Sequence, residues 1–187
     1  MLQWFKRRAE AGRTAEELYG SVVTAARQAA FYRDLGVPDT PEGRFELIAL
    51  HLFLAVENLK QKGTDTAALT QRTIEVFVTD MDDCMREMGV GDMAVGKKVK
   101  RAAAAFYERA GAYRQGLAST GPDLKNSIAR YVFGGKIEAG AATSNDAVPL
   151  ARYMRGVSVA LSTEPFDTAV ASGQLDRLLR NCGTDTP

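Results

Sequence analysis

The stretch "LIALHLFLAV", from Leu47 to Val56, is the longest apolar run in the chain. A membrane-spanning helix needs roughly 20 apolar residues, about twice this length, so the run does not predict a bilayer span. A segment that is apolar nearly all round a helix is typical of a helix buried on every side. The run therefore predicts a helix at the centre of the fold.

Helix boundary signals lie on both sides of this run. Thr40 followed by Pro41 is a favourable N-cap and first-turn pair. Gly63 can adopt the left-handed conformation that closes many helices. We expect the central helix to run between these signals and to end at Lys60 or Lys62.

Helical periodicity continues through the rest of the chain, and the alternating pattern of β-strands is hard to find. Thr14 and Glu17 have the spacing of a capping box, which predicts that the first helix starts at Thr14. Gly89 is expected to end one helix and Asp92 to N-cap the next. The expected helices besides the central one cover residues 14–33, 66–88, 92 to 114 or 116, 122–133, 146–161, 166–171 and 175–180. The sequence predicts an all-α, single-domain bundle of about six to eight helices.

Chain length and composition limit the classes of protein to which this chain can belong. At 187 residues and 20.3 kDa, the chain suits one domain. We expect residues 1–13 to form a flexible basic and aromatic segment and residues 14–187 to form one helical domain. The 24 basic and 23 acidic residues give a net charge of +1, so the overall charge does not indicate a nucleic-acid partner, and no DNA partner is expected.

The cysteines and the histidine do not form a recognisable metal or redox motif. Cys84 and Cys182 lie far apart in the sequence, which fits a reducing compartment. His51 is the only histidine and lies inside the most apolar helix, without an evident nucleophile to activate. We expect it to be buried and hydrogen-bonded to an acid or a carbonyl. No catalytic residue, metal or cofactor is predicted.

The amino terminus "MLQWFKRR" has its basic cluster after the apolar residues and lacks the pattern of a secretory signal, so we expect a cytoplasmic location. This composition also suits the interface of an anionic membrane. A frayed terminus is the alternative interpretation. The candidate membrane-contact residues are Leu2, Trp4, Phe5, Lys6, Arg7 and Arg8.

The stretch "GDMAVGKKVK", from Gly91 to Lys100, comes within one residue of a phosphate-binding loop. Lys98 stands where that motif needs a hydroxyl to ligate magnesium, and the strand that should precede the loop is missing. Nucleotide binding is therefore not predicted. We expect a tight corner between two helices in which Gly89 and Gly91 supply positive φ angles.

The acidic stretch "DMDD" matches a signature of some terpene cyclases. An isoprenoid-processing enzyme that uses Asp80, Asp82 and Asp83 is one interpretation, and it requires facing carboxylates around a deep apolar cavity. The favoured interpretation is a solvated acidic face, paired with Arg86 or with lysines of another helix.

Basic and aromatic residues alternate in "KKVKRAAAAFYERAGAYR". Cations beside aromatic rings suit RNA or acidic protein partners. The aromatic residues recur at helical spacing, however, which favours a place in the core, and the lysines favour an ordinary solvated face. The aromatic residues concerned are Phe106, Tyr107 and Tyr113.

Two long blocks of this sequence are "FYRDLGVPDTPEGRFELIALHLFLAVENL" and "DMDDCMREMGVGDMAVGKKVKRAAAAFYERAGAY". Together they resemble the ubiquinol–cytochrome c chaperone family, and the resemblance extends more weakly to the C-terminus. The matching positions of the first block are Tyr32, Gly36 to Thr40, Gly43 to Glu46, Leu50 and His51. Those of the second block are Asp80 to Asp82, Arg86 to Asp92, Lys97 and Phe106 to Arg109.

The resemblance implies an all-helical, non-enzymatic assembly factor that binds newly made cytochrome b for the respiratory ubiquinol–cytochrome c reductase. Mitochondrial members of the family act with a small partner at the ribosome. The sequence shows no long targeting extension, as expected for a bacterial member, which leaves the small co-chaperone and the ribosome contact open. The implied location is the inner face of the cytoplasmic membrane.

A client that is largely embedded in the membrane offers polar loops and helix ends, so recognition should use charge complementarity. We expect the client to contact the charged residues near the glycine corner: Arg86, Asp92, Lys97, Lys98 and Arg101. A generic helical adaptor for a soluble partner is the alternative, and it requires an exposed apolar groove.

Overall fold

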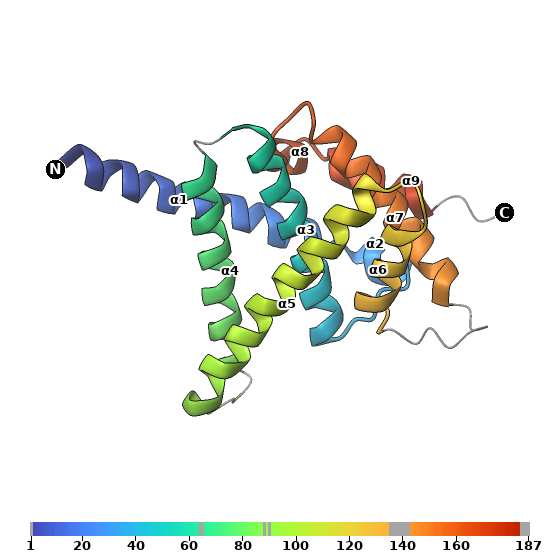
Figure 1. Ribbon diagram of the computed structural model, residues 1–187, viewed down its shortest axis with the longest axis horizontal. Coiled ribbons are helices and arrows are strands. Elements are labelled where there is room, and N and C mark those ends of the chain that lie inside the picture. The colour runs from blue at the N-terminus through green and yellow to red at the C-terminus, as the bar shows by residue number, and fades with distance from the viewer. Residues whose placement is uncertain (1, 64–65, 88, 90, 135–142, 184–187) are drawn as a thin grey trace.

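The computed structural model describes residues 2–63, 66–87, 89, 91–134 and 143–183, with backbone only at 2–11, 92–94, 143–146 and 183. In this part of the chain all regular structure is helical, which confirms the predicted all-α fold (Figure 1). The helices are α1 (Leu2–Ala26), α2 (Ala29–Arg33), α3 (Pro41–Gln61), α4 (Ala67–Glu87), α5 (Asp92–Ala118), α6 (Asp123–Tyr131), α7 (Thr143–Ala160), α8 (Phe166–Ala171) and α9 (Gln174–Gly183).

Helix α3 lies at the centre of the bundle, as predicted. It packs against α1, α4, α5, α7 and α8, and all ten residues from Leu47 to Val56 are buried. The Gly43 N–H donates a 3.1 Å hydrogen bond to the Thr40 hydroxyl, so the expected N-cap is formed. The helix ends at Gln61, and Gly63 follows with a φ of 117°.

The N-terminal helix differs from the prediction. Helix α1 begins at Leu2, so Thr14 lies inside it and does not cap it. The residues before Thr14 include lysine, arginine, alanine and glutamate, which favour a helix and extend it upstream of the capping-box spacing. The expected single helix also breaks after Ala26, and α2 begins separately at Ala29. The proposed flexibility of residues 1–13 stays a prediction.

The corner between α4 and α5 follows only part of the expected glycine pattern. Gly89 has a φ of 76° and ends α4, as predicted. Gly91 has a φ of −63° and a ψ of 145°, so it does not supply a positive φ. Gly91 itself occupies the N-cap of α5, and Asp92 is the first helical residue. The reason is that an N-cap takes an extended conformation, which a glycine adopts without a positive φ.

The C-terminal helices pack on the opposite side of α3 and α5 from α4 (Figure 1). A Cβ on Gly116 would lie 2.6 Å from the Leu124 Cα, so glycine is needed where α5 meets α6. Arg155 of α7 donates hydrogen bonds to the carbonyl oxygens at the end of α5, at Gly116 (3.0 Å), Leu117 (3.3 Å) and Ser119 (2.8 Å). These contacts join α5, α6 and α7 into one packed unit.

Candidate functional site

The corner between α4 and α5 projects from the bundle (Figure 1) and carries the charged residues expected to contact a partner. Arg86, in the last turn of α4, donates a 2.7 Å hydrogen bond from Nε to the Asp82 carboxylate. Lys97, Lys98 and Arg101 are exposed at the start of α5. The side chain of Asp92 lies outside the described residues. The structure therefore brings three of the predicted cations together on one helix.

Two further residues of α5 extend this surface. Lys100 is exposed beside the predicted cations, and Tyr107 is 55% exposed. The expectation that the aromatic residues of this helix are core residues is correct for Phe106 and Tyr113 but wrong for Tyr107. One residue turns a helix by about 100°, so neighbours such as Phe106 and Tyr107 face different surroundings. The spacing of seven residues between Lys100 and Tyr107 is the sequence signal that places them on one face.

The cations at the start of α5 differ from most others on the molecule. Between residues 95 and 107 the chain carries four cations and no carboxylate. Across the described residues, none of these four side chains makes an ion pair or a hydrogen bond. By contrast, a carboxylate pairs with each of Arg13, Arg33, Arg44, Lys60, Arg72, Arg86, Arg109, Arg114 and Arg130. The part of α5 between residues 95 and 107 therefore carries positive charge that no described carboxylate pairs with.

The predicted membrane-contact segment lies in the first turns of α1, where the helix extends away from the bundle (Figure 1). The side chains of Leu2, Trp4, Phe5, Lys6, Arg7 and Arg8 lie outside the described part of the structure. Their contact with a membrane stays a prediction. Among the described residues, no helix is both long and apolar enough to cross a bilayer.

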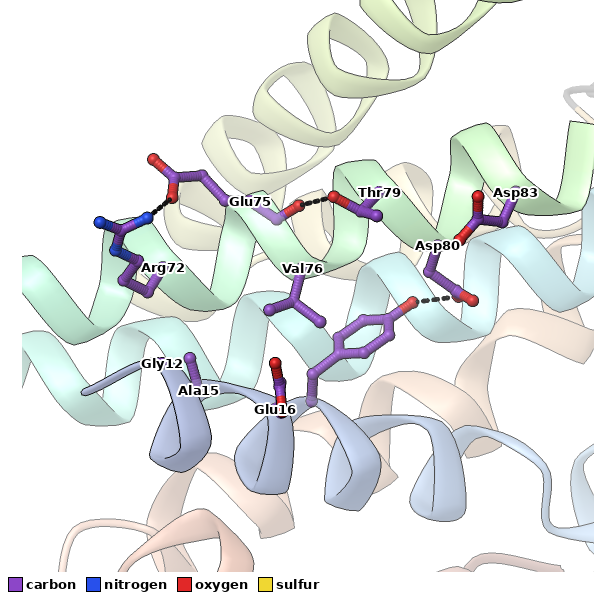
Figure 2. A pocket seen from close by; sticks show the side chains of 10 residues that line it. Gly12, Ala15, Glu16, Arg72, Glu75, Val76, Thr79, Asp80 and Asp83 are labelled. Carbon is purple, nitrogen blue, oxygen red and sulfur yellow. Dashed lines mark hydrogen bonds and ion pairs between the residues drawn. The ribbon is translucent and has the colours of Figure 1, made fainter. Parts of the chain in front are cut away.

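A pocket of about 470 Å³ lies between α1 and α4 (Figure 2). The Tyr19 hydroxyl donates a 2.6 Å hydrogen bond to the Asp80 carboxylate, which joins the two helices. Burial, together with that carboxylate, raises the pKa of Tyr19, so the phenol keeps its proton and remains a donor. The pocket is lined by Gly12, Ala15, Glu16, Tyr19, Arg72, Glu75, Val76, Thr79, Asp80 and Asp83.

The three aspartates of the acidic stretch do not form one site. Asp80 is held by Tyr19 and Asp82 by Arg86, while Asp83 is exposed at the edge of the pocket. No three acidic, histidine or cysteine side chains in the described ranges are grouped so that they could hold a metal ion. The pairing of Asp82 with Arg86 agrees with the predicted solvated acidic face. Five charged side chains line this pocket, which does not match the deep apolar cavity that the enzyme interpretation requires.

His51 is fully buried in α3 and has both ring nitrogens in hydrogen bonds. Its Nδ1 lies 2.8 Å from the Leu47 carbonyl oxygen, and its Nε2 lies 2.8 Å from the Tyr153 hydroxyl. Burial lowers the pKa of His51 to about 4, so the ring is neutral at pH 7. Nδ1–H then donates to the carbonyl, and Nε2 accepts from Tyr153. The predicted carbonyl bond is confirmed, and the ring has no nitrogen left for catalysis.

The sequence did not predict the ion pair between Glu46 of α3 and Arg109 of α5. The Arg109 Nε and Nη2 donate to the two carboxylate oxygens at 2.6 Å and 2.5 Å. Glycine is also required at position 43, because a Cβ there would lie 2.0 Å from the Pro38 carbonyl oxygen. Gly43, Glu46, His51 and Arg109 all belong to the two blocks quoted above, and each of them serves the packing of the bundle.

Comparison with known proteins gives two matches. The family described as ubiquinol-cytochrome C chaperone matches residues 33–175, which include α3, α4, α5 and the corner. The crystal structure of the Cbp3 homolog from Brucella abortus is similar with a TM-score of 0.74 and 33% sequence identity. That match covers 94% of this chain and 98% of the Brucella chain. Among curated proteins, none matches this chain.

Proposed function

The chain belongs to the ubiquinol–cytochrome c chaperone family, and on that premise we propose that it is a non-enzymatic assembly factor for ubiquinol–cytochrome c reductase. Its proposed client is newly made cytochrome b, held until its haems and partner subunits arrive. The observation that carries this proposal is the family match across residues 33–175. The similarity to the Cbp3 homolog over almost the whole chain supports it.

The polar groups of the interior support a role without catalysis. His51 has both nitrogens engaged, and Glu46 is paired with Arg109. Asp80 and Asp82 are held by Tyr19 and Arg86. General acid–base catalysis needs a group that can reach a substrate proton. The bonds of His51, Glu46 and Asp80 instead join helices to one another, and Asp82 pairs with Arg86 within α4.

The proposed contact with the client is the corner between α4 and α5. A membrane-embedded client offers mainly polar loops and helix ends to a chaperone, so exposed charges at a projecting corner suit its recognition. The candidate residues are Arg86, Asp92, Lys97, Lys98 and Arg101. Exposed charges contribute little to folding, so Lys97, Lys98 and Arg101 can serve a partner at little cost to the fold.

The proposed place of action is the cytoplasmic face of the membrane that contains the client. The segment "LQWFKRR" at the start of α1 would add a peripheral contact with anionic lipid. Removing it should loosen membrane association without unfolding the bundle. A small co-chaperone or a ribosome would be an additional partner, and the proposed role does not depend on either.

Capture of the client tests the proposed role. A tagged chain in its native host should recover newly synthesised cytochrome b more efficiently than other membrane proteins of similar size. The recovered amount should fall during a chase, as the reductase assembles. Lys97→Glu together with Lys98→Glu should reduce capture without lowering the melting temperature. Equal recovery of unrelated membrane proteins would contradict the proposal and favour a generic adaptor.

A further inference from the structure

One side of α5 forms a continuous basic surface, which we call the basic face and define as Lys97, Lys100, Arg101 and Tyr107. Lys97 lies three residues from Lys100 and four from Arg101, and Tyr107 lies seven residues after Lys100, so they share one side of the helix. The opposite stripe is buried in the bundle at Val95, Ala102 and Phe106. Because that stripe fixes the rotation of α5, the basic face points away from the protein.

The charges of the basic face repel one another. Lys97 lies three residues from Lys100 and four from Arg101, and like charges at these spacings destabilise a helix. Within the described chain, the three cations make no ion pair, although most other arginines have a carboxylate partner. No ion pair among the described residues therefore offsets this repulsion. An anionic partner outside the molecule would offset it.

The surroundings of a membrane-embedded client indicate which anion this is. The cytoplasmic surface of the bilayer is negative and attracts clusters of basic residues. Tyr107 adds an exposed ring with a polar tip, a residue type that is enriched at the level of lipid headgroups. Phospholipid is thus the anionic partner that fits this face.

We propose that the basic face docks onto the anionic phospholipid surface beside the client. This inference rests on the proposed function, and it adds anionic phospholipid as a further partner of Lys97 and Arg101 beside the client. The corner projects from the bundle in Figure 1, which leaves room for a flat surface to approach α5. Docking there would set the distance of the chaperone from the membrane and its orientation toward the client's loops.

Flotation of the purified full-length chain with lipid vesicles tests this docking. The vesicles contain phosphatidylglycerol and phosphatidylcholine, or phosphatidylcholine alone. The test variant is Lys97→Glu/Lys100→Glu/Arg101→Glu. The control, Arg27→Glu/Lys62→Glu/Arg177→Glu, makes the same change in net charge at exposed positions elsewhere on the surface. A variant with alanine at 97, 100 and 101 removes the three charges without reversing them. Circular dichroism of every variant checks that the fold is kept.

The wild-type chain should bind the anionic vesicles, and its binding should weaken as salt is raised. The test variant should bind them at least roughly a hundredfold less tightly, because each of the three lost cations contributes a factor of about five and the new carboxylates add repulsion. The control variant should lose much less, and Tyr107→Ala should show an intermediate loss. Binding of the test variant at the wild-type level, or no wild-type binding, would overturn the inference. So would tight binding to single-stranded RNA without binding to the anionic vesicles.

Client capture separates this inference from the proposed function. If vesicle binding fails while cytochrome b is still captured in the host, lipid docking is wrong and the assembly role stands. If vesicle binding depends on the basic face but cytochrome b is not captured, the assembly role is wrong and lipid docking stands.

Discussion

Arg109 of α5 holds Glu46 of α3 by two hydrogen bonds, and its guanidinium lies 5.6 Å from the Phe45 ring centre and 4.7 Å from that of Tyr131. The two charged side chains are only 15% and 7% exposed. Burial raises the pKa of Glu46 despite the neighbouring cation, because removal from water disfavours the charged carboxylate. The pair therefore specifies how α3 and α5 pack more than it adds net stability.

Breaking this pair should destabilise the fold strongly. Arg109→Ala leaves Glu46 buried without a partner, and the expected loss in unfolding free energy is about 3–5 kcal/mol. Urea denaturation measures it. Arg114→Ala is the matched control, because Arg114 also bridges α5 to α3 through Glu57 but is 51% exposed, and its expected loss is at most about 1 kcal/mol. Equal losses for the two variants would contradict the buried role of the pair.

His51 should make stability depend on pH between 6.5 and 4. Burial lowers its pKa from the ordinary value of 6.5 to about 4, so the unfolded chain binds a proton in this window and the folded chain does not. Its contribution is complete above pH 6.5 and is lost as the pH falls towards 4, by about 3 kcal/mol in total. His51→Gln removes the titration, so its unfolding free energy should vary less across the window. Parallel pH profiles for the two proteins would show that His51 is not the group responsible.

Two glycine substitutions should have opposite effects. Gly43→Ala places a Cβ 2.0 Å from the Pro38 carbonyl oxygen, and the expected loss from overpacking is about 1–3 kcal/mol or more. Gly111→Ala, inside α5, meets nothing within 4 Å and should stabilise the protein by about 0.5–1 kcal/mol. Thermal denaturation of both variants checks the prediction. A neutral Gly43→Ala would mean that the Pro38 turn moves without cost.

The acidic stretch should be dispensable for function. In the variant Asp80→Asn/Asp82→Asn/Asp83→Asn, the amide oxygen introduced at position 80 can still accept the hydrogen bond of Tyr19. The expected level of assembled reductase in a host that carries this variant is that of the wild type. An enzyme that used these carboxylates would lose its activity. Loss of the reductase with normal amounts of folded protein would therefore revive the enzyme interpretation.

Local signals were enough to predict part of this fold. The apolar run at Leu47–Val56 and the Thr40 cap define α3 because burial and capping depend on neighbouring residues. The capping-box spacing at Thr14 failed because favourable helix residues precede it. The partners of Glu46 and His51 lie 63 and 102 residues away, so only the packed bundle reveals them. Exposure of Tyr107 likewise depends on how α5 is rotated against the bundle.

Deletion of the gene in the native host tests the central claim most directly. The amounts of cytochrome b and of assembled ubiquinol–cytochrome c reductase are measured by immunoblotting and haem absorbance, against another respiratory complex as the reference. We predict that the reductase and cytochrome b fall while the reference complex keeps its level, and that the wild-type gene restores both. Normal amounts of the reductase, with a defect in another process, would contradict the assembly role.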